Sequence, residues 1–131
     1  MKKILILGFI LIGFSVFSQQ DESRVESMKR EFLTNELQLT AQESDAFFPL
    51  YNEYSQKRKE ARKSLRAERK TMMNDGESSV DKIIDLEQDL IDLQKEYLEK
   101  FRKILPEKKV VQLIEAEKKF KLMMVSRLKN K

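Results

Sequence analysis

Arginines at helical spacing carry the most distinctive chemistry in this sequence. They recur from position 58 at intervals of four, four and three residues, which gathers them along one stripe of a helix. Nearby apolar residues adjoin that stripe. Arginines attract acidic partners over long range, and flexible apolar side chains make adaptable contacts. The pattern therefore makes this stripe a candidate protein-binding surface, and a solvated face whose charges are paired within the chain is the alternative. The candidate partner-binding residues are Arg58, Arg62, Arg66, Arg69, Leu65, Met72 and Met73.

Enzyme chemistry has little support in the sequence. The chain contains neither His nor Cys, so catalysis would depend on carboxylates, Ser or Lys held in a dry pocket. Acidic side chains such as Asp85, Asp89 and Asp92 recur at spacings of three to four residues, as solvated helix faces do. We therefore predict no catalytic residues and a protein that is not an enzyme.

Metal and cofactor binding are similarly unsupported by residue type. Without His or Cys, the softest ligands are the adjacent methionine pairs at 72–73 and 123–124, which suit Cu(I). Adjacent positions on a helix do not converge on one ion, so core packing explains these pairs more simply. We predict no metal and no cofactor, with a metal-responsive protein as a remaining alternative.

The charges of the chain are segregated along its length. Residues 57–70 carry eight Lys and Arg against Glu60 and Glu68, whereas residues 75–99 carry nine Asp and Glu against Lys82 and Lys95. The total charge is only +4. A nearly balanced total argues against nucleic acid as a partner, and the two runs suit mutual pairing if their helices are neighbours.

The first 18 residues have the pattern of a secretory signal. Lys2 and Lys3 precede an apolar run from Ile4 to Phe17, and small residues near Ser18 suit cleavage. We predict a signal peptide at 1–18, a periplasmic location and no integral membrane segment after cleavage. An uncleaved anchor is the alternative.

The remainder, residues 19–131, is rich in helix-forming residues and predicts one all-α domain. A short first helix is expected at about 24–36, because Ser23 and Glu26 have capping-box spacing. Gly76 marks a turn between two long helices, at about 41–74 and 79–105, that form an antiparallel hairpin. A C-terminal helix completes a four-helix fold.

Two helix starts are marked by local motifs. Thr40 and Glu43 have the spacing of a second capping box, with Leu39 in the position of a hydrophobic staple. Pro106 suits the first turn of the last helix. Pro49 lies inside the first long helix, where it predicts a kink, although a helix that starts afresh at Pro49 is an alternative.

With these motifs in place, the chain resembles the LTxxQ family of Spy/CpxP-like periplasmic proteins. It is most similar to a Bacteroidetes branch described as sensors of extracytoplasmic-function (ECF) sigma factors. Three positions depart from the pattern: Glu43 and Lys109 stand where Gln is typical, and Pro106 stands where Thr is typical. The matching segments are 39–43, 47–54, 104–109 and 115–120.

The resemblance implies a non-enzymatic protein of the envelope-stress response. Such a protein either holds misfolded polypeptides as a chaperone or senses and modulates stress through an ECF sigma factor system. The expected partners are unfolded or regulatory envelope proteins. A second copy of the chain is also expected, because a lone hairpin has a narrow core and leaves apolar stripes exposed. A structural adaptor with one fixed protein partner is the alternative.

Overall fold

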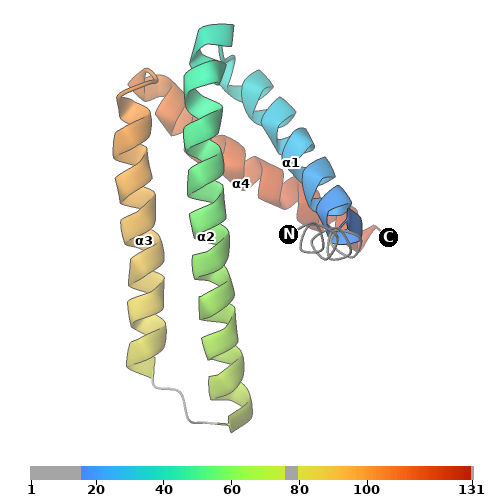
Figure 1. Ribbon diagram of the computed structural model, residues 1–131, viewed down its shortest axis with the longest axis vertical. Helices are drawn as coiled ribbons and strands as arrows, with labels where there is room; N and C mark the ends of the chain where they lie inside the picture. The colour runs from blue at the N-terminus through green and yellow to red at the C-terminus, as the bar shows by residue number, and fades with distance from the viewer. Residues whose placement is uncertain (1–15, 76–79, 131) are drawn as a thin grey trace, which may run out of the picture. The chain divides into compact units, whose positions relative to one another are not determined.

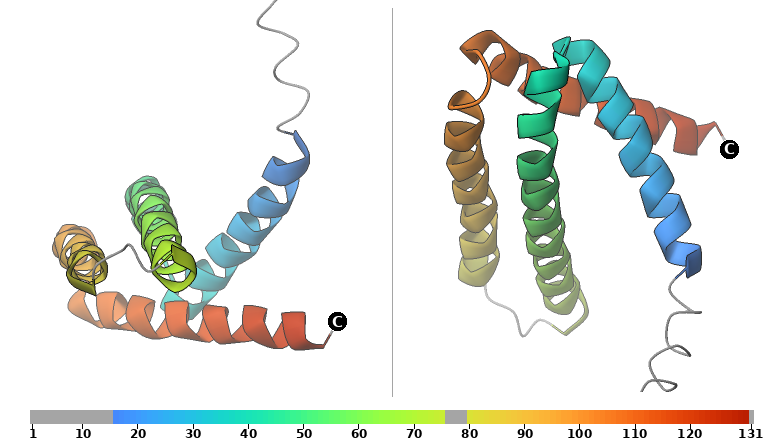
Figure 2. Two further views of the ribbon diagram at one scale, coloured as in Figure 1. Left: turned by 90° about the horizontal axis from the view of Figure 1, so that it is seen from below. Right: turned by 45° about the horizontal axis from the view of Figure 1, so that its top comes forward.

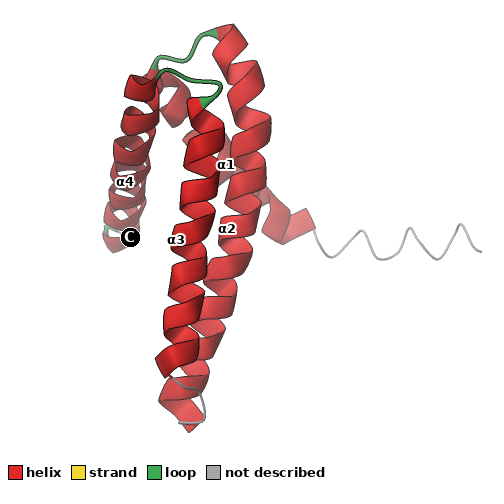
Figure 3. Cartoon of the chain, turned by 90° about the vertical axis from the view of Figure 1, so that its left-hand side faces the viewer, coloured by secondary structure: helices red, strands yellow, loops and turns green. Residues whose placement is uncertain are grey.

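The structure is a computed structural model that describes residues 16–75 and 80–130. This part of the chain forms four successive α-helices and contains no strand (Figures 1 and 3). The all-α, four-helix prediction is therefore confirmed. The helices are α1 (Val16–Leu37), α2 (Ala41–Asp75), α3 (Val80–Arg102) and α4 (Glu107–Lys129).

The chain divides into two compact units. One unit is Leu39–Glu115, which contains α2, α3 and the first part of α4. The other combines Met1–Gln38 with Ala116–Lys131, and so contains α1 and the remainder of α4. The sequence-based expectation of a single domain at 19–131 stays a prediction.

The predicted capping box starts α2. The Glu43 amide donates to the Thr40 hydroxyl at 3.1 Å, and the Thr40 amide donates to the Glu43 carboxylate at 2.9 Å. These bonds satisfy two amides that a helix start leaves without helical partners. α2 then runs through Pro49 to Asp75, so the alternative of a helix that begins at Pro49 is wrong.

α2 and α3 lie side by side and run in opposite directions in all three ribbon views (Figures 1–3). Residues 76–79, which join them, lie outside the described residues, and so does the turn predicted at Gly76. The core between the two helices is a cluster of aromatic rings, with centroids 5.0–6.4 Å apart. Each such aromatic pair stabilises the fold by about 0.5–1.5 kcal/mol beyond the contribution from burying its apolar surface. The rings belong to Phe47, Phe48, Tyr51, Tyr54, Tyr97 and Phe101.

The packing between α2 and α3 thins toward the ends that residues 76–79 connect. Among the described residues beyond the aromatic cluster, the buried hydrophobic side chains are Leu65 on α2 and Ile83 on α3. An ion pair accompanies them, with Lys82 Nζ 3.1 Å from an oxygen of the half-buried Glu68. The two helices are therefore held most firmly at the aromatic end.

α4 begins directly after Pro106, as the sequence predicts. The Pro106 carbonyl accepts from the amides of Lys109 at 2.9 Å and Val110 at 3.2 Å, which forms the first turn. Proline is well suited to this position because a first-turn residue has no helical partner for its missing N–H. Leu105, Val110 and Leu113 are buried around this start.

The second unit joins α1 to the later part of α4. The rings of Phe32 and Phe120 lie 5.5 Å apart, and Lys119 Nζ lies 3.2 Å from a Glu36 oxygen. The buried face of α4 in this unit uses Ala116 and Phe120, whereas Leu128, near the end of the helix, is 74% exposed.

α1 is longer than the sequence suggests. It begins at Val16, within the predicted signal segment, and not at about residue 24. The Ser23–Glu26 spacing does not start a helix here, because the Gln, Asp and Glu residues before Ser23 can also be helical. α1 ends at Leu37, where Gln38 adopts φ of 50° and its amide donates to the Asn35 carbonyl at 3.3 Å.

Candidate functional site

Exposed arginines and aliphatic residues share one face of the α2–α3 pair, which we call the Arg/aliphatic face. Each helix contributes three residues to this face. They are spaced by four and then seven positions, so they lie along one side of that helix. Met73 is 82% exposed, Ile84 is 54% exposed and Ile91 is 47% exposed. The face consists of Arg62, Arg66 and Met73 on α2 and of Val80, Ile84 and Ile91 on α3.

A small pocket shows that the two stripes lie on the same side. Arg62 from α2 and Ile91 from α3 both line it. The two helices are antiparallel (Figure 1). The eleven residues from Arg62 forward to Met73 on α2 therefore span the same length as the eleven residues from Ile91 back to Val80 on α3. Arginine and aliphatic side chains therefore run beside each other along the pair.

The pocket has a volume of about 150 Å³. Its lining combines the phenol ring of Tyr54 and the aliphatic side chains of Leu90 and Ile91 with polar groups at Arg58, Arg62 and Gln94. Leu90 is half-buried and Tyr54 is buried, whereas Arg62, Ile91 and Gln94 are exposed. An apolar floor with guanidinium groups at its edge suits a ligand that has both an aliphatic and an anionic part.

Arg58 is held in place by two tyrosines. Its guanidinium carbon lies 4.5 Å from the centroid of the Tyr54 ring. Its two terminal nitrogens donate to the Tyr54 hydroxyl at 3.3 Å and toward the Tyr51 hydroxyl at 3.5 Å. Stacking on an aromatic face preorganises a planar guanidinium.

The other predicted partner-binding residues divide into exposed and core positions. Arg69 forms an ion pair with Glu87 of α3, so it also joins the two helices. Leu65 is only 6% exposed, and its assignment to an exposed binding surface is wrong because it fills the core between α2 and α3. Met72 is half-buried, whereas its neighbour Met73 is exposed.

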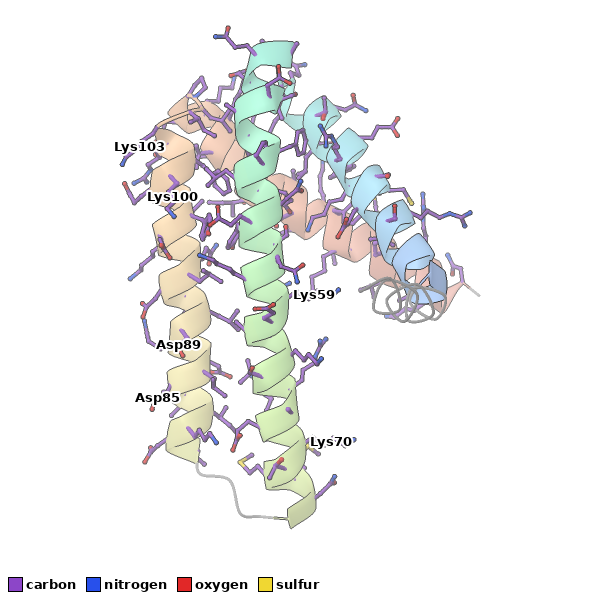
Figure 4. All side chains as sticks on the ribbon, in the orientation of Figure 1. Lys59, Lys70, Asp85, Asp89, Lys100 and Lys103 are labelled. Carbon is purple, nitrogen blue, oxygen red and sulfur yellow. The ribbon has the colours of Figure 1, made fainter. Side chains whose placement is uncertain are left out.

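Several of the remaining charged side chains lie on the outer edges of the helix pair. Lys59 and Lys70 extend from α2 on the side away from α3, and Asp85 extends from α3 away from α2 (Figure 4). Only some of the basic side chains of residues 57–70 therefore face the acidic residues of α3. Asp85, Asp89 and Asp92 are all exposed, in agreement with a solvated helix face.

Two lysines flank Tyr97 within the same unit. Lys57 Nζ lies 5.5 Å and Lys100 Nζ lies 4.5 Å from the centroid of the Tyr97 ring. The nearby Tyr97 hydroxyl raises the pKa of Lys57 and lowers the pKa of Glu53. Each pKa shift favours the charged form, so Lys57 and Glu53 stay ionised near neutral pH.

Sequence reasoning missed a contact between the two helix starts. Lys109 Nζ lies 2.5 Å from the Glu43 carboxylate that also closes the capping box of α2. The hydrogen bond from Lys109, followed by that from the Thr40 amide, lowers the pKa of Glu43. Glu43 and Lys109, two of the positions that depart from the LTxxQ pattern, are therefore direct partners. Their opposite charges were the only available signal.

Within the described ranges, no His, Cys, Asp or Glu residues gather in a group of three or more that could hold a metal ion. Among the described helices, none has the length and apolar character needed to cross a membrane. Comparisons with protein-family models, curated proteins and solved structures give no match.

Proposed function

We propose that this chain is a non-enzymatic, extracytoplasmic stress protein that binds misfolded polypeptides and keeps them from aggregating. The N-terminal export pattern and the resemblance to the LTxxQ family support the location and the class. The Arg/aliphatic face is the observation that carries the proposal, because it combines the two kinds of contact that an unfolded chain offers.

The physical basis is weak and adaptable binding. Arg62 and Arg66 attract acidic segments of a client and can also stack on its aromatic rings. Ile84, Ile91 and Met73 then contact apolar side chains that a folded client would bury. Because the aliphatic residues are interspersed with charged ones, the contacts are shallow, and a client can leave to refold.

The protein is also proposed to act as a homodimer. Leu122, Val125 and Leu128 are exposed along the later part of α4, where a second copy would cover them. Light scattering at micromolar concentration should give the mass of two chains. A stable monomer at that concentration would remove the dimer from the proposal.

Aggregation of a chemically denatured model client tests the chaperone function. The wild-type chain should suppress light scattering at near-stoichiometric amounts. The variant Ile84→Ser/Ile91→Ser should suppress it several-fold less, since the aliphatic contacts are lost. The matched control, Lys59→Ser/Asp85→Ser, changes the outer edges and should behave as wild type. No suppression by wild type at low or moderate salt would refute the chaperone function.

The resemblance to the ECF-sensor branch favours a second role, in which the same face binds one regulatory membrane protein. Crosslinking in the native envelope separates the two roles. Many captured proteins support the chaperone, whereas one stoichiometric protein, with altered transcription after deletion of the chain, supports the sensor. One captured protein without a transcriptional effect supports a fixed-partner adaptor.

A further inference from the structure

We infer that Met73 is the first of the described methionines to be oxidised by a hypohalous acid, and that its sulfoxide weakens the binding of clients to the Arg/aliphatic face. The second half of this statement rests on the proposed function, because it concerns the same face. The exposure of each methionine, and the residues that share a face with the most exposed one, carry the inference.

Methionine is the residue type through which this sequence meets an oxidant. The chain contains six Met residues but no Cys, Trp or His. Cysteine and methionine are the side chains whose sulfur atoms such oxidants attack, and their susceptibility follows exposure. Without Cys, the thioethers take up the oxidant. The order in which they react then depends on how far the fold exposes each of them.

The fold exposes these thioethers to very different degrees. Met73 is 82% exposed, whereas its neighbour Met72 is half-buried. Met72 follows the buried Leu65 by seven residues, which places both on the side of α2 that packs against α3. Met73 therefore offers its side chain most fully to an oxidant in solution. The remaining methionines of the described residues are at most 36% exposed, and they are Met28, Met123 and Met124.

The modification is a transfer of one oxygen atom to sulfur. In the net reaction with hypochlorous acid, an S–O bond forms at Met73 Sδ while the O–Cl and O–H bonds of the acid break. Sulfur is oxidised by two electrons, chlorine leaves as chloride, and the proton goes to water. The product is a polar sulfoxide with two epimers, and each epimer is reduced back to methionine by its own class of methionine sulfoxide reductase.

Met73 belongs to the Arg/aliphatic face, so a change in its polarity changes what that face can bind. Val80 and Ile84 of α3 belong to the same face and are 61% and 54% exposed. The thioether adds a flexible apolar contact to those of the two aliphatic side chains. A sulfoxide resists the loss of its water when a client approaches. Oxidation should therefore lower client affinity, whereas the fold, which does not bury this side chain, should persist.

Peptide mapping after limited treatment with hypochlorous acid tests the order of oxidation on the full chain. Tryptic cleavage places Met72 and Met73 in peptide 71–82, and Met123 and Met124 in peptide 122–127. Tandem mass spectrometry then distinguishes the two neighbours within each peptide. Sulfoxide should form several-fold faster at Met73 than at Met72 or Met123. Equal rates at Met72 and Met73, or faster oxidation at Met123, would overturn the inference.

Suppression of client aggregation tests the effect of the sulfoxide. At a dose that oxidises Met73, about fivefold more wild-type chain should be needed for the same suppression, because an apolar contact is lost. Treatment with both classes of reductase should restore the original activity. Met73→Leu keeps an aliphatic side chain without sulfur and should not respond to the same dose. Met123→Leu, on α4 and outside the face, is the matched control and should respond as wild type does.

A variant that is polar without oxidation completes the test. Met73→Gln should reproduce the loss of suppression in the absence of oxidant, with unchanged helix content by circular dichroism. Full suppression by the oxidised wild type, or an equal loss in oxidised Met73→Leu, would overturn the inference. Absence of suppression by the untreated wild type would instead refute the chaperone function. The order of oxidation is measured without a client, so the two failures are distinguishable.

Discussion

Lys109 and Glu43 join the starts of two helices that are far apart in sequence. Their charged atoms lie 2.5 Å apart, and the Glu43 carboxylate also accepts the Thr40 amide at 2.9 Å. One side chain thus caps α2 and holds the first turn of α4 against it.

This relationship predicts strong coupling between the two positions. Glu43→Gln and Lys109→Gln should each lower the melting temperature, because each leaves the other charge without its closest partner. The double variant, with Gln at both positions, should be more stable than either single variant. Thermal unfolding in a double-mutant cycle measures this coupling. The exposed pair Lys100–Glu96 should couple only weakly in the same assay, and simple additivity at positions 43 and 109 would refute the prediction.

The same contact predicts how stability depends on pH. The pKa of Glu43 in the folded chain lies below its ordinary value, because Lys109 and Thr40 bind the charged form. The unfolded chain therefore takes up a proton first as the pH falls. The contribution of Glu43 is complete above its ordinary pKa and decreases as the pH drops through the lower, folded value. Urea unfolding should show a large difference between wild type and Glu43→Gln at pH 7 and a smaller one near pH 3; an unchanged difference would contradict this account.

The aromatic cluster should dominate the stability of the α2–α3 pair. Phe101 is fully buried and contacts Phe47, with ring centroids 5.2 Å apart. Phe101→Ala should cost about 3–5 kcal/mol of unfolding free energy, through lost burial and a cavity. Urea denaturation monitored by circular dichroism measures it. Val111→Ala, at a 53% exposed position, is the control and should cost far less.

Uneven packing along α2 and α3 predicts uneven local stability. Near Tyr51 and Phe101 the helices are joined by packed aromatic rings, whereas near Met72 and Ile84 they depend on a few buried residues and on ion pairs. Backbone amides near Met72 and Ile84 should exchange with solvent faster than those near Tyr51 and Phe101. Hydrogen exchange followed by mass spectrometry measures both regions in one experiment. Uniform protection along the pair would contradict the prediction.

Local signals in the sequence predict the helices well. The capping box at Thr40 and Glu43 depends on residues three apart, so the sequence displays it directly. Pro106 marks the start of α4 for a similar reason. The beginning of α1 is harder to predict, because Ser23 and Glu26 also fit within a longer helix.

Contacts between distant residues are where the sequence is least informative. Lys109 and Glu43 are 66 positions apart, and only the folded arrangement brings them together. By residue type and by its position beside the arginines, Leu65 resembles an exposed binding residue. Its orientation on α2 nevertheless places it in the core. The arginine stripe is visible in the sequence, but the fixed position of Arg58 depends on the rings beneath it.

The central claim is that the Arg/aliphatic face contacts non-native polypeptides. Photo-crosslinking from single positions tests it most directly, with the reactive side chain placed either at Ile91 on this face or at Asp89. Two residues along a helix turn the side chain by about 200°, so Asp89 serves as the matched control on the same segment. A denatured client should crosslink strongly from position 91 and weakly from position 89. Equal capture from both positions, or none from position 91, would contradict the claim.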